Sequence, residues 1–106
     1  IPALAQAATE RLRALGVENV EVTPGDGGAG LPRHAPFATI LVSAAAPRVP
    51  PPLLQQLAEG GRLVAPIGPR QRQRLQRWVK KGRRCKRESL TPVRFVPLTG
   101  EWGVDN

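Results

Sequence analysis

The sequence is poor in the residues on which metal binding and side-chain catalysis usually depend. It contains one Cys, one His, no Met and no Tyr in 106 residues. Cys85 alone cannot close an internal disulfide, and together with His34 it falls short of the three or four ligands of an ordinary zinc site. These shortages exclude a disulfide-stabilised scaffold and indicate a reducing, cytoplasmic setting.

Long apolar segments are also missing. No run reaches the roughly 18 residues of a membrane-spanning helix, and no signal segment opens the chain, so we expect no membrane partner. The length allows one domain at most. The chain opens Ile1-Pro2 without an initiator Met, which leads us to expect a processed, trimmed or partial protein.

The N-terminal segment has the pattern of an amphipathic helix. Pro2 suits a first helical turn, and Gly16 is a typical end. The apolar residues between them recur at intervals of three and four: Leu4, Ala8, Leu12 and Leu15. We expect this stripe to pack on a sheet.

Three apolar runs that end in small residues follow, which predicts an α/β fold. Residues 19–23, 37–43 and 62–67 are the expected strands, and the continuous apolarity of 37–43 is typical of a buried parallel strand. Between the last two strands, 53–57 is an expected short helix closed by Gly60-Gly61. The order of these elements predicts parallel pairing with right-handed crossovers.

Beyond Pro69 the composition becomes strongly basic. Sixteen Lys and Arg against eight Asp and Glu give a net charge of +8, and many of these cations lie between residues 70 and 87. Strands at 73–80 and 86–98, with Gly82 as a turn, predict an antiparallel hairpin whose second strand is interrupted by prolines. We therefore divide a single domain into an α/β part, 1–68, and a basic hairpin and tail, 69–106.

Ligands of open α/β sheets bind beyond the carboxyl ends of the strands, which directs attention to 26–28 and 43–47. In Gly25-Asp26-Gly27, a carboxylate flanked by glycines suits an adenine amino group or a ribose hydroxyl, although Asp-Gly turns are common. The small side chains of residues 43–47 could form a surface on which a cofactor or peptide lies, or they could simply allow a tight turn from strand to loop. Ser43 lacks a plausible base, because His34 lies in a Gly/Pro loop without an evident orienting carboxylate.

The basic segment has a second interpretation. With Trp78 as a stacking surface, residues 70–87 could follow a nucleic-acid backbone, although a solvated hairpin has the same composition. A glycine-rich phosphate-binding motif after a first strand is not found in the sequence.

Taken in order, several motifs of the chain resemble the distal half of the protein-L-isoaspartate O-methyltransferase family. The motifs are Ile1 to Ala5, Val20-Glu21-Val22 with Gly25-Asp26-Gly27, Ala35-Pro36-Phe37, Ala44 to Pro47, Leu57 to Gly61, Arg62 to Gly68 and Val93 to Leu98. The resemblance implies a partial Rossmann-like class I S-adenosylmethionine-dependent methyltransferase sheet, mostly parallel with a C-terminal antiparallel hairpin.

The resemblance also implies a reaction: transfer of a methyl group from S-adenosylmethionine to the α-carboxylate of L-isoaspartyl residues in damaged proteins, a repair activity. It implies cofactor binding by Asp26, Gly27, Ala44 and Thr99. It implies that isoaspartyl peptides are bound by the residues Ala45, Ala46, Pro47, Val93, Phe95 and Val96. A catalytic residue is not implied, because a carboxylate is already ionised at neutral pH.

The family's glycine-rich cofactor turn and its ribose-binding acidic residue would lie upstream of Ile1. Without the family's central first strand, we expect 19–23 to lack a route of pairing to 37–43, so that sheet edges stay open. We accordingly expect little methyl transfer by the isolated chain. The alternative hypothesis is a degenerate, non-catalytic relative that binds nucleic acid or another anionic surface.

Overall fold

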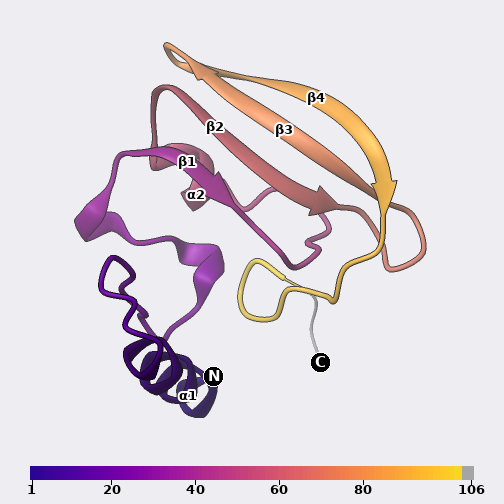
Figure 1. Cartoon of the computed structure of the whole chain (residues 1–106). Helices are drawn as coiled ribbons and strands as arrows, with labels where there is room; N and C mark the ends of the chain where they lie inside the picture. The colour runs from indigo at the N-terminus through magenta and orange to yellow at the C-terminus, as the bar shows by residue number, and fades with distance from the viewer. Residues whose placement is uncertain (104–106) are drawn as a thin grey trace.

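The computed structural model describes residues 1–103 and contains two helices, two 3₁₀ turns and four strands within that range. The helices are α1 (Pro2–Ala14) and α2 (Pro51–Gln55), and the 3₁₀ turns are η1 (Gly27–Ala29) and η2 (Pro32–His34). The strands are β1 (Phe37–Leu41), β2 (Leu57–Ile67), β3 (Gln73–Lys81) and β4 (Arg84–Val93). They form one sheet in the order β1-β2-β3-β4 (Figure 1).

The pairings confirm the predicted α/β unit and the predicted hairpin. β1 and β2 are parallel and are connected through α2, whereas β2 with β3 and β3 with β4 are antiparallel. The described sheet is therefore mixed rather than mostly parallel as expected. Gly82, between β3 and β4, has a φ of +61°, the left-handed conformation that favours glycine in a tight turn. The sheet is continuous from the α/β part into the basic hairpin.

The core lies on one face of β2. Successive residues of a strand point to opposite faces, so Leu63, Ala65 and Ile67 share the face that α2 covers with Leu53. Leu63 is fully buried, with an exposed fraction of 0 %. Burial of such a side chain stabilises a fold by about 1.5–3 kcal/mol.

The expected end of α2 is wrong. The helix ends at Gln55, and Gly60 and Gly61 lie inside β2 rather than closing the helix. The pairing of β1 with β2 shifts register in this region, between Phe37 and Thr39. A Cβ on Gly61 would lie 2.9 Å from the Phe37 carbonyl oxygen, so this glycine is required by the close approach of the two strands.

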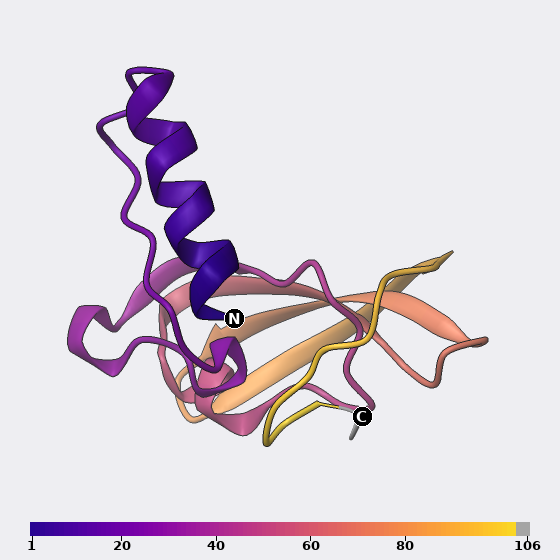
Figure 2. The ribbon, with the colours of Figure 1, turned by 90° about the horizontal axis from the view of Figure 1, so that it is seen from below.

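The predicted helix at the N-terminus is confirmed, but its predicted packing is wrong. α1 begins at Pro2 and ends before Gly16, whose φ is +75°. None of its residues is buried, and Leu4 and Leu15 are 64 % and 72 % exposed. Figure 2 shows α1 projecting away from the sheet.

The predicted strand at 19–23 is also absent from the structure. This segment has no regular secondary structure and hydrogen-bonds to no strand of the described part, and Val20 is 52 % exposed. An extended segment becomes a strand only by pairing with a neighbour. Because this segment does not join the sheet, α1 has no sheet face on which to lie.

β1 is parallel, as predicted, but it is not buried on both sides. It is an edge strand that pairs only with β2 among the described strands, and Leu41 is 76 % exposed. The open sheet edge expected from the resemblance is therefore confirmed at β1. Within residues 1–103, none of the helices has the length and apolarity needed to span a membrane.

Candidate functional site

The loop after the 19–23 segment is organised by the Asp26 carboxylate. Oδ1 of Asp26 accepts a hydrogen bond from the Gly28 N–H at 3.0 Å, which caps η1. Oδ2 accepts one from the Glu101 N–H at 3.1 Å. A Cβ on Gly100 would lie 2.7 Å from the Asp26 carboxyl group, so the two segments are in close contact. Asp26 therefore forms the turn that its sequence suggested and also holds the C-terminal segment.

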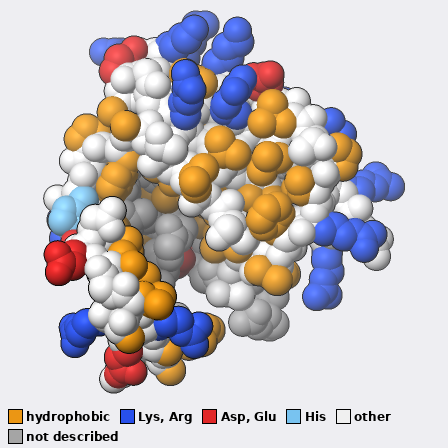
Figure 3. All heavy atoms as spheres, viewed as in Figure 1, with side chains coloured by type: hydrophobic (Ala, Val, Ile, Leu, Met, Phe, Trp, Pro, Cys, Tyr) orange, Lys and Arg blue, Asp and Glu red, His pale blue; other side chains and the backbone are white. Residues whose placement is uncertain are grey.

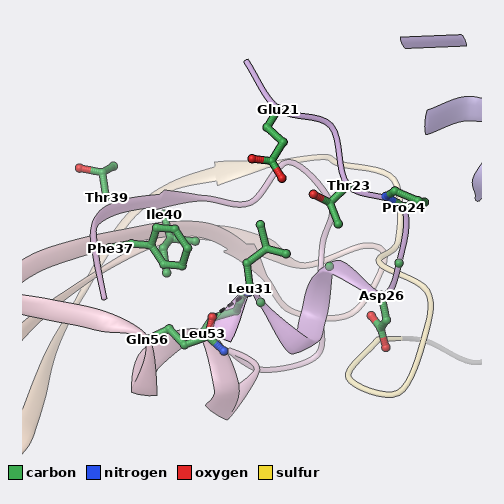
Figure 4. Close-up of a pocket in the computed structure, with 13 residues that line it drawn as sticks. Glu21, Thr23, Pro24, Asp26, Leu31, Phe37, Thr39, Ile40, Leu53 and Gln56 are labelled. Carbon is green, nitrogen blue, oxygen red and sulfur yellow. Dashed lines mark hydrogen bonds between the residues drawn. The ribbon is translucent and has the colours of Figure 1, made fainter. Parts of the chain in front are cut away.

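A cavity of about 440 Å³ lies beside this loop (Figure 4). It is lined by Glu21, Thr23, Pro24, Gly25, Asp26, Gly27, Gly30, Leu31, Phe37, Thr39, Ile40, Leu53 and Gln56. Figure 4 shows Phe37 across the cavity from Glu21 and Thr23, with Asp26 at the end nearest the C-terminal loop. The volume is within the range of small-molecule sites, and apolar walls with a few polar groups are typical of them.

The backbone at the rim of this cavity is accessible. A Cβ built on Gly25 or on Gly27 would meet no heavy atom within 4 Å. Open space above two glycines lets a flat ring approach the backbone closely. The rim of the cavity is therefore open at Gly25 and Gly27.

Gln56 holds the other side of the loop, and sequence reasoning missed it. Its side chain is largely buried; Nε2 donates to the Ala29 carbonyl at 3.0 Å, and Oε1 accepts from the Leu31 N–H at 2.8 Å. These bonds join the loop to the end of α2. A glutamine after a short helix carries no local signal of such a contact, because both partners are about 25 residues away in sequence.

The second predicted strand end, 44–47, is held between β2 and the C-terminal segment. Ala45 donates to the Val96 carbonyl and accepts from the Leu98 N–H, both at 2.7 Å. Ala46 donates to Pro66 and accepts from Gly68, which continues the edge of β2. The side chains of Ala45 and Ala46 are only 2 % and 1 % exposed. Their small size lets three segments meet at this point.

Gln73 organises the segment after β4 and was likewise missed by sequence reasoning. It is 3 % exposed; Nε2 donates to the Phe95 carbonyl at 3.1 Å, and Oε1 accepts from the Phe95 N–H at 2.6 Å. The amide side chain thus makes the two backbone hydrogen bonds that a neighbouring strand would otherwise make with Phe95. The side chains of Phe95 and Val96 remain 37 % and 71 % exposed.

The C-terminal segment 96–101 brings the two predicted strand ends into one region. Its beginning pairs with Ala45, and its end donates to Asp26. Thr99 lies between these contacts and is exposed. Asp26 and Gly27 line the cavity, whereas Ala44 and Thr99 belong to the segments that meet beside it. Pro47 is exposed at the end of its strand exit, and Val93 lines a different hollow, next to Gln73.

The chemistry available within residues 1–103 is that of a binding site. No group of three or more His, Cys, Asp or Glu in this range is placed to hold a metal ion. His34 does face a carboxylate that the sequence did not indicate, because its Nε2 lies 3.7 Å from Oε2 of Glu21. Both groups are exposed, and no hydrogen bond of the described part joins His34 to Ser43, so a nucleophile and base are not assembled there.

Comparison with known proteins gives the family. The model of the family Protein-L-isoaspartate(D-aspartate) O-methyltransferase matches residues 1–103. The chain belongs to this family. A protein-L-isoaspartate O-methyltransferase of Roseiflexus castenholzii is 56 % identical over 98 residues, which cover 92 % of the chain and 45 % of the relative. One of Methanoculleus marisnigri is 48 % identical over 103 residues, or 97 % of the chain and 47 % of the relative.

Two solved structures of similar proteins support the fold. One named protein-L-isoaspartate O-methyltransferase superposes with a TM-score of 0.87 at 32 % identity, over 93 % of the chain and 32 % of that structure. The other is a putative member from Plasmodium falciparum in complex with S-adenosyl-L-homocysteine. Its TM-score is 0.77 at 24 % identity, over 93 % of the chain and 49 % of that structure. The partial class I methyltransferase fold is thereby confirmed, and the chain spans about half the length of the curated relatives that it matches.

Proposed function

We propose that this protein acts as a protein-L-isoaspartate O-methyltransferase, and that the described residues contribute one wall of its cofactor site and one wall of its peptide site. Membership of the family supports the activity. The observation that carries the assignment of the site is the convergence of both predicted strand ends on the segment 96–101, beside a cavity that Asp26 and Gly27 line. The convergence supports a cofactor site and a peptide site in one neighbourhood.

The residues present fit the nucleoside half of S-adenosylmethionine. Each Asp26 oxygen has a backbone donor, and a carboxylate oxygen accepts a second bond, so Asp26 has capacity left for an adenine amino group or a ribose hydroxyl. Among residues 1–103 no partner is found for the Gly27 N–H, which is placed to donate to a ring nitrogen. Ala44 and Thr99 would close the same site from the neighbouring segments.

When bound, S-adenosylmethionine supplies a methyl group on a positively charged sulfur. Asp26 and Gly27 would hold its nucleoside, and the methyl group would be supplied to the α-carboxylate of an isoaspartyl residue. Because a carboxyl group with a pKa near 4 is already ionised at neutral pH, the protein has no proton to remove. Its work is alignment of the two reactants.

In the peptide site, the exposed side chains of Phe95 and Val96 provide apolar contact, with Val93 and Pro47 at its margins. Ala45 and Ala46 act through their small size, since they let the peptide wall and the cofactor wall approach each other. The single free Cys85 supports a reducing, cytoplasmic location for this repair activity.

The test uses a protein of the relatives' full length that contains residues 1–106, and it compares Asp26→Asn with Glu59→Gln as a matched loss of one carboxylate. Glu59 lies on β2, outside the lining of the cavity, and its carboxylate accepts from the Gly82 N–H of the β3–β4 turn. Methyl-labelled S-adenosylmethionine and an isoaspartyl peptide are the substrates, and the same peptide with ordinary aspartate is the blank. A hydrogen bond to a charged group contributes about 1.5–3 kcal/mol, so we expect Asp26→Asn to raise the KM for the cofactor by about tenfold or more. The KM for the peptide should change little.

Equal methylation of the isoaspartyl and aspartyl peptides would contradict the proposed activity. An unchanged cofactor KM in Asp26→Asn, with activity present, would contradict the proposed nucleoside site. The chain alone, without the rest of the relatives' length, is expected to transfer little methyl; robust turnover by residues 1–106 would overturn that expectation.

A further inference from the structure

Beside the proposed peptide wall, the surface is hollowed and strongly basic. One hollow of about 740 Å³ is lined by Arg70, Gln71, Arg94, Phe95, Val96 and Pro97. An adjoining hollow of about 620 Å³ is lined by residues 71–74 and 92–94. The two adjoin at Gln71 and Arg94, and we refer to them together as the arginine groove.

The arginine groove lies at the end of the sheet that carries the proposed site. Ala46 bridges to Ile67 at the end of β2, directly before the β2–β3 turn that contains Arg70. Ala45 bridges to Pro97, a residue that lines the groove. Gln73 fixes the backbone of Phe95 through its two hydrogen bonds. The floor of the groove is therefore anchored to the strand ends rather than carried on a free loop.

The cations of this groove are not neutralised within the described structure. Arg70, Arg72 and Arg94 are exposed, and no carboxylate of residues 1–103 lies within 4.0 Å of their guanidinium nitrogens. Arg74 is different, because it donates to Ser89 and to the Leu90 carbonyl. Figure 3 shows Lys and Arg side chains along the top and along the right of the view, next to an apolar patch.

We propose that the arginine groove binds the residues that flank the isoaspartyl residue in a substrate peptide, and that Arg70 and Arg94 select acidic side chains there. This proposal rests on the proposed function, since it takes the neighbouring strand ends as the methylation site. The occupant is an acidic peptide segment because two guanidinium groups that have no carboxylate partner among residues 1–103 border an apolar strip of Phe95, Val96 and Pro97. Arginine binds carboxylates through two parallel N–H donors, which suits Asp and Glu side chains.

The second basic surface of the chain lacks this combination. Near the β3–β4 turn, the hollow lined by Arg62, Arg77, Lys81 and Lys86 also contains Glu88, which pairs with Arg77. It lies at the other end of the hairpin, because Lys81 pairs with Arg84 there, whereas Gln73 pairs with Val93 at the site end. Nonspecific attraction of anions would involve both surfaces, whereas selection of a peptide involves only the arginine groove.

The experiment measures binding of fluorescein-labelled peptides to the 106-residue chain by fluorescence anisotropy. Two isoaspartyl peptides differ only in their flanking residues, which are Glu in one and Gln in the other. The double variant Arg70→Gln/Arg94→Gln is compared with Arg83→Gln/Arg84→Gln, which removes the same charge at the far turn. Circular dichroism checks that each variant is folded.

We expect the unaltered chain to bind the Glu peptide more tightly, by about two- to tenfold, given the usual strength of two exposed ion pairs. This preference should disappear in Arg70→Gln/Arg94→Gln, persist in Arg83→Gln/Arg84→Gln, and shrink as salt is raised from 50 to 500 mM. Equal affinity for the two peptides, or equal loss in both double variants, overturns the proposal. The proposal would also be overturned if a short oligonucleotide displaced the Glu peptide equally well from the two double variants.

The same titration with aspartyl versions of both peptides separates this proposal from the proposed function. A preference for Glu that is present with aspartyl and isoaspartyl peptides alike supports the groove while counting against isoaspartyl recognition. Preference for isoaspartyl peptides without any effect of the flanking Glu has the opposite meaning: the proposed function stands and the groove proposal fails.

Discussion

Replacement of Gln73 by Leu tests whether one buried side chain positions the proposed peptide wall. Leu keeps most of the volume of the glutamine but leaves the Phe95 N–H and carbonyl without their partners. Each net hydrogen bond contributes about 0.5–1.5 kcal/mol, and an orphaned buried group costs about 1–3 kcal/mol. Because Phe95 is 37 % exposed and its two bonds to Gln73 are only partly buried, we expect a loss of about 1–3 kcal/mol in the free energy of unfolding.

Two measurements check this reasoning. Urea denaturation gives the change in the free energy of unfolding, and amide hydrogen exchange reports the Phe95 N–H directly. The matched control is Gln76→Leu: Gln76 lies on the same strand, and its Oε1 accepts only from Nε1 of Trp78 among the described contacts. In Gln73→Leu we expect the Phe95 N–H to exchange faster than the lower free energy of unfolding alone would explain. In Gln76→Leu we expect it to exchange as in the unaltered chain. Unchanged protection of Phe95 in Gln73→Leu would refute the assigned role.

Two further predictions concern the fold. Leu63→Ala removes a side chain that is 0 % exposed, and we expect a loss of about 2–5 kcal/mol measured by urea denaturation; a loss below 1 kcal/mol would contradict the placement of the core on β2. Gly82 has a φ of +61° with open space around it, so Gly82→Val should destabilise by about 1–2 kcal/mol through backbone strain, and Gly82→Asn by clearly less. Equal thermal stability of the two Gly82 variants would show that strain at the turn does not matter.

Local patterns predicted much of the fold because their causes are local. The spacing of Leu4, Ala8 and Leu12 predicted α1, and Gly82 between two polar strands predicted the hairpin turn. The same patterns failed wherever the outcome depended on a neighbour. Segment 19–23 does not pair with a described strand, and α1 consequently does not pack on the sheet.

The candidate site divides in the same way. Asp26 between glycines at the end of an apolar run was recognisable in the sequence, since the turn and the open backbone are properties of those residues. Gln56 and Gln73 were not recognisable. Each acts through hydrogen bonds to backbone groups more than twenty residues away, and glutamine is common on surfaces.

The sequence by itself therefore determined the N-terminal helix, the basic hairpin, the turn at Asp26, and the resemblance that the family match confirmed. Only the tertiary structure decided that segment 96–101 joins the Asp26 turn to residues 45–46 and that two buried glutamines hold the loops. It alone also shows that exposed arginines, without a carboxylate partner among residues 1–103, border the proposed peptide wall. The physical reason is that periodicity and turn chemistry are encoded within a few residues. Pairing partners, burial and unmatched charge exist only once distant segments come together.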